Sequence, residues 1–154
     1  MIQRIQSVFF LLAGILPAIT FWCPLAVYTG PAVSEPQYVL SALGLLSQAE
    51  GGIVAYSWGI LFFNLLSLVV AFYALFSYKN RRQQIRIGGW LISSLMLSAL
   101  SLVAYGYSYA EVRHLDFMPY WGTLLLFFSV FFAILGRRAV RKDEELVRAA
   151  DRIR

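Results

Sequence analysis

Residues 55–86 of the chain read AYSWGILFFNLLSLVVAFYALFSYKNRRQQIR. Residues 55–78 contain no Asp, Glu, Lys, Arg or His, and four basic residues follow at once: Lys79, Arg81, Arg82 and Arg86. A helix needs about 20 mainly apolar residues to cross a hydrocarbon core of about 30 Å. The stretch is therefore typical of a membrane span that ends in a basic loop.

The composition of the whole chain points the same way. Of its 154 residues 60% are apolar and 14% are charged, and the mean hydropathy is +0.68. Soluble domains average about 45–50% apolar and about 25% charged residues. The net charge is +5, and the basic residues lie beside apolar runs. We therefore expect the partner to be an anionic lipid surface and not a nucleic acid. The single cysteine, Cys23, can form no internal disulfide and is no metal site by itself.

Three further stretches are long and apolar enough to cross a bilayer. We predict four spans in one membrane domain over residues 1–154, at about residues 5–27, 55–78, 87–107 and 119–135, with no charged residue inside any of them. Backbone groups in lipid must be satisfied within the segment, so helices are expected. The predicted fold class is an all-α integral membrane protein with a four-helix bundle of two hairpins and a helical C-terminal tail.

The distribution of basic residues predicts the orientation. The segments before, between and after the four predicted spans carry one, none, four, one and seven Lys or Arg residues in order. Short cytoplasmic loops accumulate these residues, so both termini and the middle loop are expected on the cytoplasmic side of a bacterial inner membrane. Aromatic residues at the opposite ends of the spans agree with this orientation: Trp22, Tyr28, Tyr56, Trp58, Tyr105, Tyr107, Tyr109, Tyr120 and Trp121.

The first outer loop, about residues 28–54, contains an apolar segment that is too short to span a membrane. Residues 38–46 fit either a short strand that pairs with the chain after Pro24 or a helix that lies in the interface. The residues leave these two alternatives open.

Small and polar residues inside the spans predict where the helices pack. Helices in lipid associate through close backbone approach and interhelical hydrogen bonds. Asn64 is the single amide in the predicted spans after residue 8, and we expect it to bond across a helix interface. The other candidate packing residues repeat at helical spacing: Ser94, Ser98 and Ser101 in the third span, and Gly122, Ser129 and Gly136 along the fourth. Pro17 predicts a kink in the first span, because it removes a helical hydrogen bond.

The tail, residues 137–154, reads as an amphipathic continuation of the fourth span. The pairs Arg141–Glu145 and Glu144–Arg148 stand four residues apart, a spacing that supports a helix. The residues expected to contact lipid headgroups or a cytoplasmic protein partner are basic and lie in the middle loop and the tail: Lys79, Arg81, Arg82, Arg86, Arg137, Arg138, Arg141 and Lys142.

Three cytoplasmic stretches resemble a known family. They are MIQRIQ at residues 1–6, YKNRRQQIR at residues 78–86 and RKDEELVRAADRIR at residues 141–154. The chain resembles an uncharacterised bacterial membrane family, domain of unknown function 4293, found mainly in the Bacteroidetes lineage. The resemblance implies four transmembrane helices and an inner-membrane location, and it implies no activity.

The residues favour a non-enzymatic accessory, interaction or assembly subunit. Intramembrane catalysis needs a nucleophile with a base or a set of metal ligands, and one histidine and one cysteine in different segments offer neither. We expect no catalytic residue, cofactor or metal. The alternative is a small transporter or channel subunit, whose path would have to use Asn64, the serines of the third span and the kink at Pro17.

Overall fold

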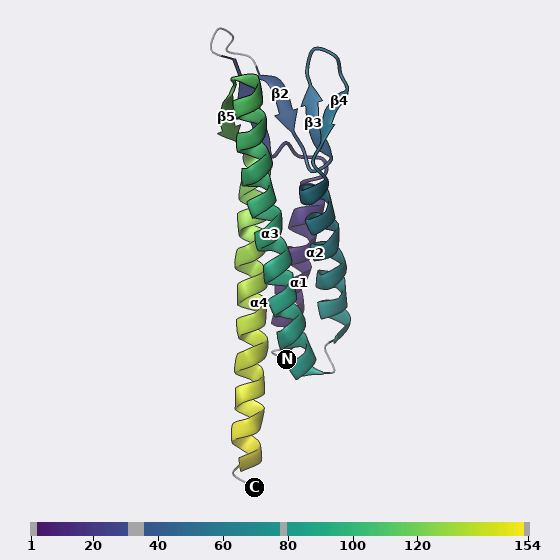
Figure 1. Cartoon of the computed structure of the whole chain (residues 1–154). Coiled ribbons are helices and arrows are strands. Elements are labelled where there is room, and N and C mark those ends of the chain that lie inside the picture. The colour runs from purple at the N-terminus through teal and green to yellow at the C-terminus, as the bar shows by residue number, and fades with distance from the viewer. Residues whose placement is uncertain (1–2, 31–35, 78–79, 153–154) are drawn as a thin grey trace.

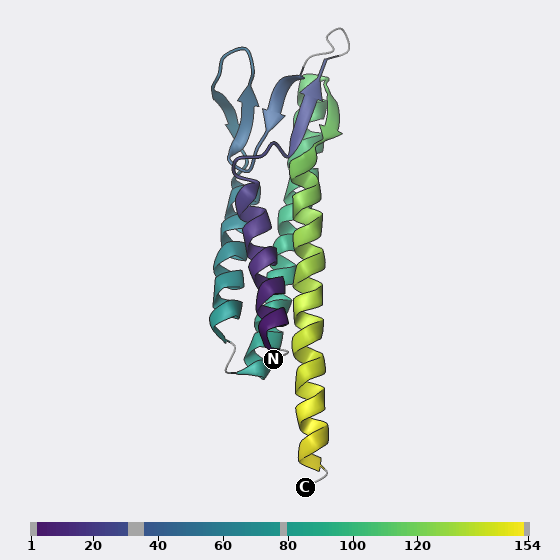
Figure 2. The same cartoon turned by 180° about the vertical axis from the view of Figure 1, so that it is seen from behind.

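The structure, a computed structural model, describes residues 3–30, 36–77 and 80–152. Its helices run side by side, and a sheet covers one end of them (Figures 1 and 2). The order along the chain is α1 (Gln3–Ile19), β1 (Ala26–Thr29), β2 (Pro36–Leu40), β3 (Gly44–Ser47), β4 (Ile53–Tyr56), α2 (Trp58–Phe76), α3 (Arg81–Arg113), β5 (Asp116–Pro119) and α4 (Trp121–Arg152). We call the covered end the sheet end. The opposite end, where α3 begins and α4 extends beyond the other helices, is the basic end.

The predicted all-α fold class is wrong, because the chain forms a five-stranded antiparallel sheet in the order β4-β3-β2-β1-β5. Four strands come from the segment between α1 and α2, and β5 joins them from the turn before α4. Val27 stands opposite both Val39 of β2 and Met118 of β5. Of the two alternatives for residues 38–46, the structure has the strand: β2 pairs with β1, the chain that follows Pro24.

The prediction of four spans also fails as a description of the helices. By length and composition three of the described helices, α2, α3 and α4, can cross a membrane, whereas α1 has an apolar stretch of only Ile5–Ile19. The predicted span 5–27 overran this helix. At its end the amides of Thr20 and Phe21 turn back onto the carbonyls of Pro17 and Ala18, and the chain then leaves to form β1.

The four helices pack as a ring in which α1 lies between α4 and α2, and α3 closes the other side. Two buried apolar clusters fill it. One, around Phe10, Leu91 and Ala133, lies toward the basic end. The other, around Leu25, Tyr28 and Leu102, joins the sheet to the helix ends.

Hydrogen bonds from the start of α4 attach the sheet to the helices at Pro24 and Leu25, where the chain passes from α1 to β1. The Gly122 amide donates to the Pro24 carbonyl at 3.0 Å, and the Thr123 hydroxyl donates to the Leu25 carbonyl at 2.6 Å. Farther along, the Tyr28 hydroxyl donates to the Gly106 carbonyl of α3 at 3.2 Å. Burial, with a smaller contribution from Tyr109, raises the pKa of the Tyr28 phenol well above its ordinary value, so this donor keeps its proton.

The close approach at Gly122 yields a test of this attachment. A Cβ at Gly122 would stand 2.5 Å from the Pro24 carbonyl oxygen, a backbone atom that cannot rotate away. We expect Gly122→Ala to lower the free energy of unfolding by about 1–3 kcal/mol, as overpacking does, measured by thermal denaturation in detergent micelles. The matched control is Gly52→Ala, where a Cβ meets no atom within 4 Å. An unchanged melting temperature in Gly122→Ala would contradict the close contact between Gly122 and the Pro24 carbonyl.

Candidate functional site

Asn64 forms a hydrogen-bonded bridge between three parts of the bundle. Its Nδ2 donates to Thr20 Oγ1, just after α1, at 2.9 Å, and its Oδ1 accepts from Ser98 Oγ of α3 at 2.8 Å. The side chains of all three residues are fully buried. A buried polar group is stable only when it is hydrogen-bonded, so this bridge fixes how α1, α2 and α3 align.

The three other candidate serines bond within their own helices, and the two glycines allow close approach. The hydroxyls of Ser94, Ser101 and Ser129 donate to carbonyls of their own helices, at Leu91, Leu97 and Leu125. Gly122 lies against the Pro24 carbonyl, and Gly136 lies against the ring of Phe10. The structure thus gives Asn64 and Ser98 a side-chain hydrogen bond across helices. The two glycines allow close approach, and the Gly122 amide also bonds to the Pro24 carbonyl.

At the basic end Phe10 and two glutamines, which were not among the predicted packing residues, join neighbouring helices: Phe10 and Gln6 hold α1, and Gln84 joins α3 to α2. A Cβ at Gly88 or Gly136 would stand 3.4 Å or less from the Phe10 ring, so this ring fills the space that two glycines leave on α3 and α4. The buried Gln6 donates to the Ala139 carbonyl at 3.2 Å, and the buried Gln84 donates to the Ala74 carbonyl at 3.0 Å. Glutamine next to an apolar run is the signal that could have found them.

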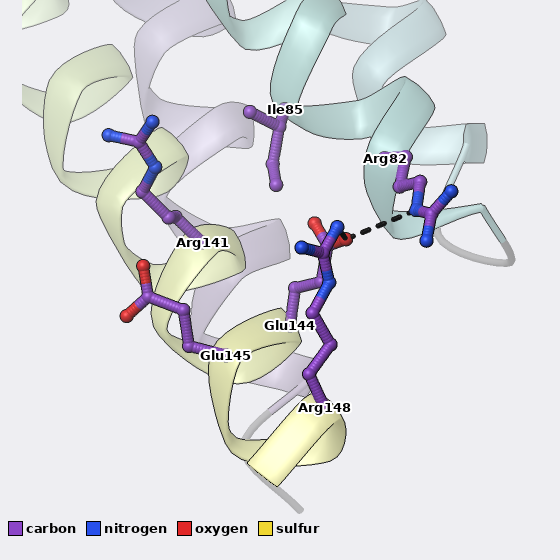
Figure 3. A pocket seen from close by; sticks show the side chains of 6 residues that line it. All are labelled: Arg82, Ile85, Arg141, Glu144, Glu145 and Arg148. Atoms are coloured by element: carbon purple, nitrogen blue, oxygen red, sulfur yellow. Dashed lines mark hydrogen bonds and ion pairs between the residues drawn. The ribbon is translucent and has the colours of Figure 1, made fainter. Parts of the chain in front are cut away.

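A charged groove of about 390 Å³ lies between the first turn of α3 and α4. Figure 3 shows the six residues that line it: Arg82, Ile85, Arg141, Glu144, Glu145 and Arg148. Glu144 Oε1 accepts from Arg148 at 2.6 Å and from Arg82 at 3.3 Å, which joins the two helices and confirms the predicted Glu144–Arg148 pair. Arg141 and Glu145 lie across the groove from Arg82 (Figure 3).

A second ion pair ties the same two helices together. Arg81 Nε stands 3.1 Å from Asp143 Oδ2, without the alignment of a hydrogen bond, and the Asp143 side chain is 13% exposed. Asp143 and Glu144 therefore neutralise the two arginines of the first turn of α3. Exposed ion pairs contribute about 0–1 kcal/mol each, so we assign these pairs a positioning role and only a small part of the stability.

The remaining basic residues of the prediction stay on the surface. Arg86, Arg137, Arg138, Arg141 and Lys142 are exposed, and Lys79 lies outside the described residues. The Arg137 guanidinium lies over Gly89 of α3, where a Cβ would stand 3.6 Å from its central carbon. In the described part of the chain no three His, Cys, Asp or Glu side chains come together in a way that could hold a metal ion.

A family model described as "Domain of unknown function (DUF4293)" matches residues 2–153. The chain belongs to the DUF4293 family. This confirms the family that the three basic stretches indicate. The search of curated proteins found no match to this DUF4293 chain.

The bridge at Asn64 can be measured by a double-mutant cycle. With Asn64→Leu and Ser98→Ala, we expect a coupling energy of about 0.6 kcal/mol, the average for hydrogen bonds between membrane helices, from denaturation of the single and double variants. Ser129→Ala is the matched control, since Ser129 is equally buried but bonds to its own helix. Its coupling to Asn64→Leu should stay within about 0.3–0.5 kcal/mol of zero. Equal coupling in both pairs would contradict the bridge.

Proposed function

We propose that this chain is a non-enzymatic assembly subunit of a bacterial inner membrane, with its basic end in the cytoplasm, where it binds anionic lipid headgroups and a protein partner. The observation that carries this proposal is the contrast between the two ends of the bundle. In the sequence every Lys and Arg except Arg113 falls in the segments at the basic end. Such an excess at one end is typical of the cytoplasmic side.

The exposed aromatic residues support a membrane between the two ends of the bundle. Tyr and Trp favour the membrane–water interface, where an apolar ring and a polar group are both satisfied. At the sheet end Trp22, Trp58 and Trp121 are all more than half exposed, and at the basic end Trp90 of α3 is 60% exposed. Three long apolar helices are compatible with a membrane between these two levels.

The exposed cations of α4 support contact with anionic headgroups. Arg137, Arg138, Arg141 and Lys142 fall within an arc of about 140° when 3.6 residues make a turn. They lie just past the apolar part of α4, and the two acids nearest to α3, Asp143 and Glu144, are already paired with Arg81 and Arg82. Each basic residue near an anionic surface contributes about 1 kcal/mol of attraction.

The alternative of a transporter or channel subunit has less support from the geometry. A path for solutes would use polar groups that face a cavity. Asn64 and Ser98 instead bond to each other in a fully buried site, and the Pro17 carbonyl accepts a hydrogen bond from the Thr20 hydroxyl at 2.6 Å.

The proposal is tested by removing the four cations together. Replacement of Arg137, Arg138, Arg141 and Lys142 by Gln should abolish the thermal stabilisation of the purified chain by phosphatidylglycerol over phosphatidylcholine nanodiscs. In native membranes solubilised with mild detergent, the wild-type chain should migrate in a complex larger than the monomer, and the quadruple variant should not.

The control for this experiment is Arg113→Gln, which removes the one basic residue at the sheet end. It should leave both the lipid effect and the complex unchanged. A wild-type chain that migrates as a monomer, or a quadruple variant that behaves like the wild type, would overturn the proposal.

A further inference from the structure

The uncharged part of the bundle is about as thick as the hydrocarbon core of a membrane. Arg137, the first charged residue of α4, lies over Gly89 of α3. From this level toward the sheet end, α3 carries no charged residue until Glu111, which is 22 residues or about 33 Å farther along the helix. A hydrocarbon core of about 30 Å fits this distance, so we take the level of Arg137 as its inner edge.

α1 ends well inside this core. Thr20, the residue after the helix, is joined through Asn64 to Ser98 of α3. Ser98 is nine residues from Gly89, or about 14 Å along α3. α1 therefore covers only the inner part of the core on its side of the bundle.

The turn that follows α1 lies at the depth of the outer leaflet. The Pro24 carbonyl accepts from the Gly122 amide, and Gly122 is 15 residues or about 22 Å from Arg137 along α4. Irregular backbone is tolerated at such a depth only when its polar groups are bonded within the protein. The amides of residues 20–23 and 25 all donate to backbone carbonyls, and Pro24 has no amide proton. The donors of this turn therefore meet the requirement for a segment in lipid.

A groove of about 360 Å³ lies between this turn and the sheet. Phe21 and Trp22 line it from the turn, Leu43 lines it from the loop before β3, and Ile53 lines it from β4. Trp22 is 84% exposed, Leu43 is 44% exposed and Ile53 is 41% exposed. No charged residue lines the groove, and its one amide side chain, Gln48, follows the end of β3 that points away from the helices (Figure 1).

We propose that this groove is a lipid-binding site that holds an acyl chain of a phospholipid of the outer leaflet. The inference rests on the membrane location in the proposed function, and it assigns a lipid to the side of the bundle that α1 leaves open. At the depth of the turn the surroundings are hydrocarbon, which matches a groove that carries no charge. Gln48 lies on the headgroup side, where its amide meets polar groups.

The side chains of the groove favour a lipid over a transmembrane helix of a partner or of a second copy. Helices in membranes associate through small residues that let their backbones come close. The exposed residues of this groove, Trp22, Leu43 and Ile53, are large instead. An acyl chain is thin and flexible, so it can fill the space between large side chains. Lipid also adjusts its packing where an apolar stretch is shorter than the core, as it is at α1.

The depth of the groove is tested with a spin label on the full-length chain in lipid nanodiscs. Leu43→Cys in a Cys23→Ser chain carries the label in the groove. Oxygen, which concentrates in hydrocarbon, should relax this label more strongly than a water-soluble nickel chelate does. The matched control is Ala49→Cys in the same chain, because Ala49 is exposed in the turn at the far end of the same hairpin. There the chelate should be the stronger agent.

The lipid itself is tested with a phospholipid that carries a photoreactive group in the middle of its acyl chain. In the same nanodiscs it should label residues 21–24 and 43–46 at least about tenfold more than Phe62, a preference of about 1.4 kcal/mol. Phe62 is the reference for lipid that merely surrounds the protein, since it is 62% exposed on α2 and lies two residues from Asn64.

Two substitutions on the same hairpin provide a matched pair. Leu43→Asp places a charge in the groove, whereas Val54→Asp places one on the other face of β4, at a residue that is 39% exposed. We expect Leu43→Asp to remove the preference for the groove and Val54→Asp to leave it unchanged. Equal melting temperatures in detergent show that both variants are folded. If Leu43→Asp does not fold, the label at position 43 still decides the question.

Three outcomes would overturn the inference. Stronger relaxation at position 43 by the chelate would place the groove in water, and shielding from both agents would mean that protein covers it. Equal labelling of the groove and of Phe62 would leave only surrounding lipid. The proposed function fails separately, when the wild-type chain migrates as a monomer or when the quadruple variant behaves like the wild type. Neither of these results changes the relaxation of the label at position 43.

Discussion

The structure depends on the contact of Phe10 with two glycines on different helices. Helices pack closely where small residues let their backbones approach, and in lipid this matters most, because burying one apolar side chain against another gains little there. Gly88 and Gly136 provide that approach, and the Phe10 ring fills the space between α3, α4 and α1. The contact sets the position of α1 in the ring of helices, although α1 is the shortest of the four. Because α1 is held there, the chain that follows Ile19 lies next to the start of α4 before it forms β1.

The sheet follows from where α1 ends. Because the helix stops at Ile19, the chain crosses the bundle at Pro24 and Leu25, where α4 begins and supplies donors from Gly122 and Thr123. β1 then lies between β2 and β5, and it joins the two segments that form the sheet. Tyr28 anchors this strand to Gly106 of α3 through a buried hydroxyl. Both ends of the bundle are thus tied by a few contacts at small residues.

The sequence predicted the long helices well because their signal is local. The apolar runs of α2, α3 and α4 and the basic residues beside them can be read within short windows. The sheet could not be predicted in this way, since its five strands have four or five residues each and β5 pairs with β1 from about 90 positions away. A run of apolar residues also hid the end of α1, because residues 21–27 are apolar whether they form helix or strand.

The sequence predicted single residues of the candidate site, but it did not predict how these residues pair. The interhelical role of Asn64 follows from an amide inside an apolar run, whereas its partner Thr20 lies just after a helix whose end was misplaced. The basic residues were evident, but their sequence does not say that Asp143 and Glu144 reach back to Arg81 and Arg82. That pairing depends on the lengths of α3 and α4 together. It decides which cations remain free at this end of the bundle.

In this structure α4 continues past the bundle as one helix that is held by these ion pairs. The most direct measurement is hydrogen–deuterium exchange of the full chain in lipid nanodiscs, followed for the amides of residues 141–150. We predict exchange at least about tenfold slower than in an unstructured peptide, or about 1.4 kcal/mol of protection. In the Asp143→Asn, Glu144→Gln double variant we predict a partial loss of this protection. Exchange of these amides at the unstructured rate in the wild-type chain would contradict the account.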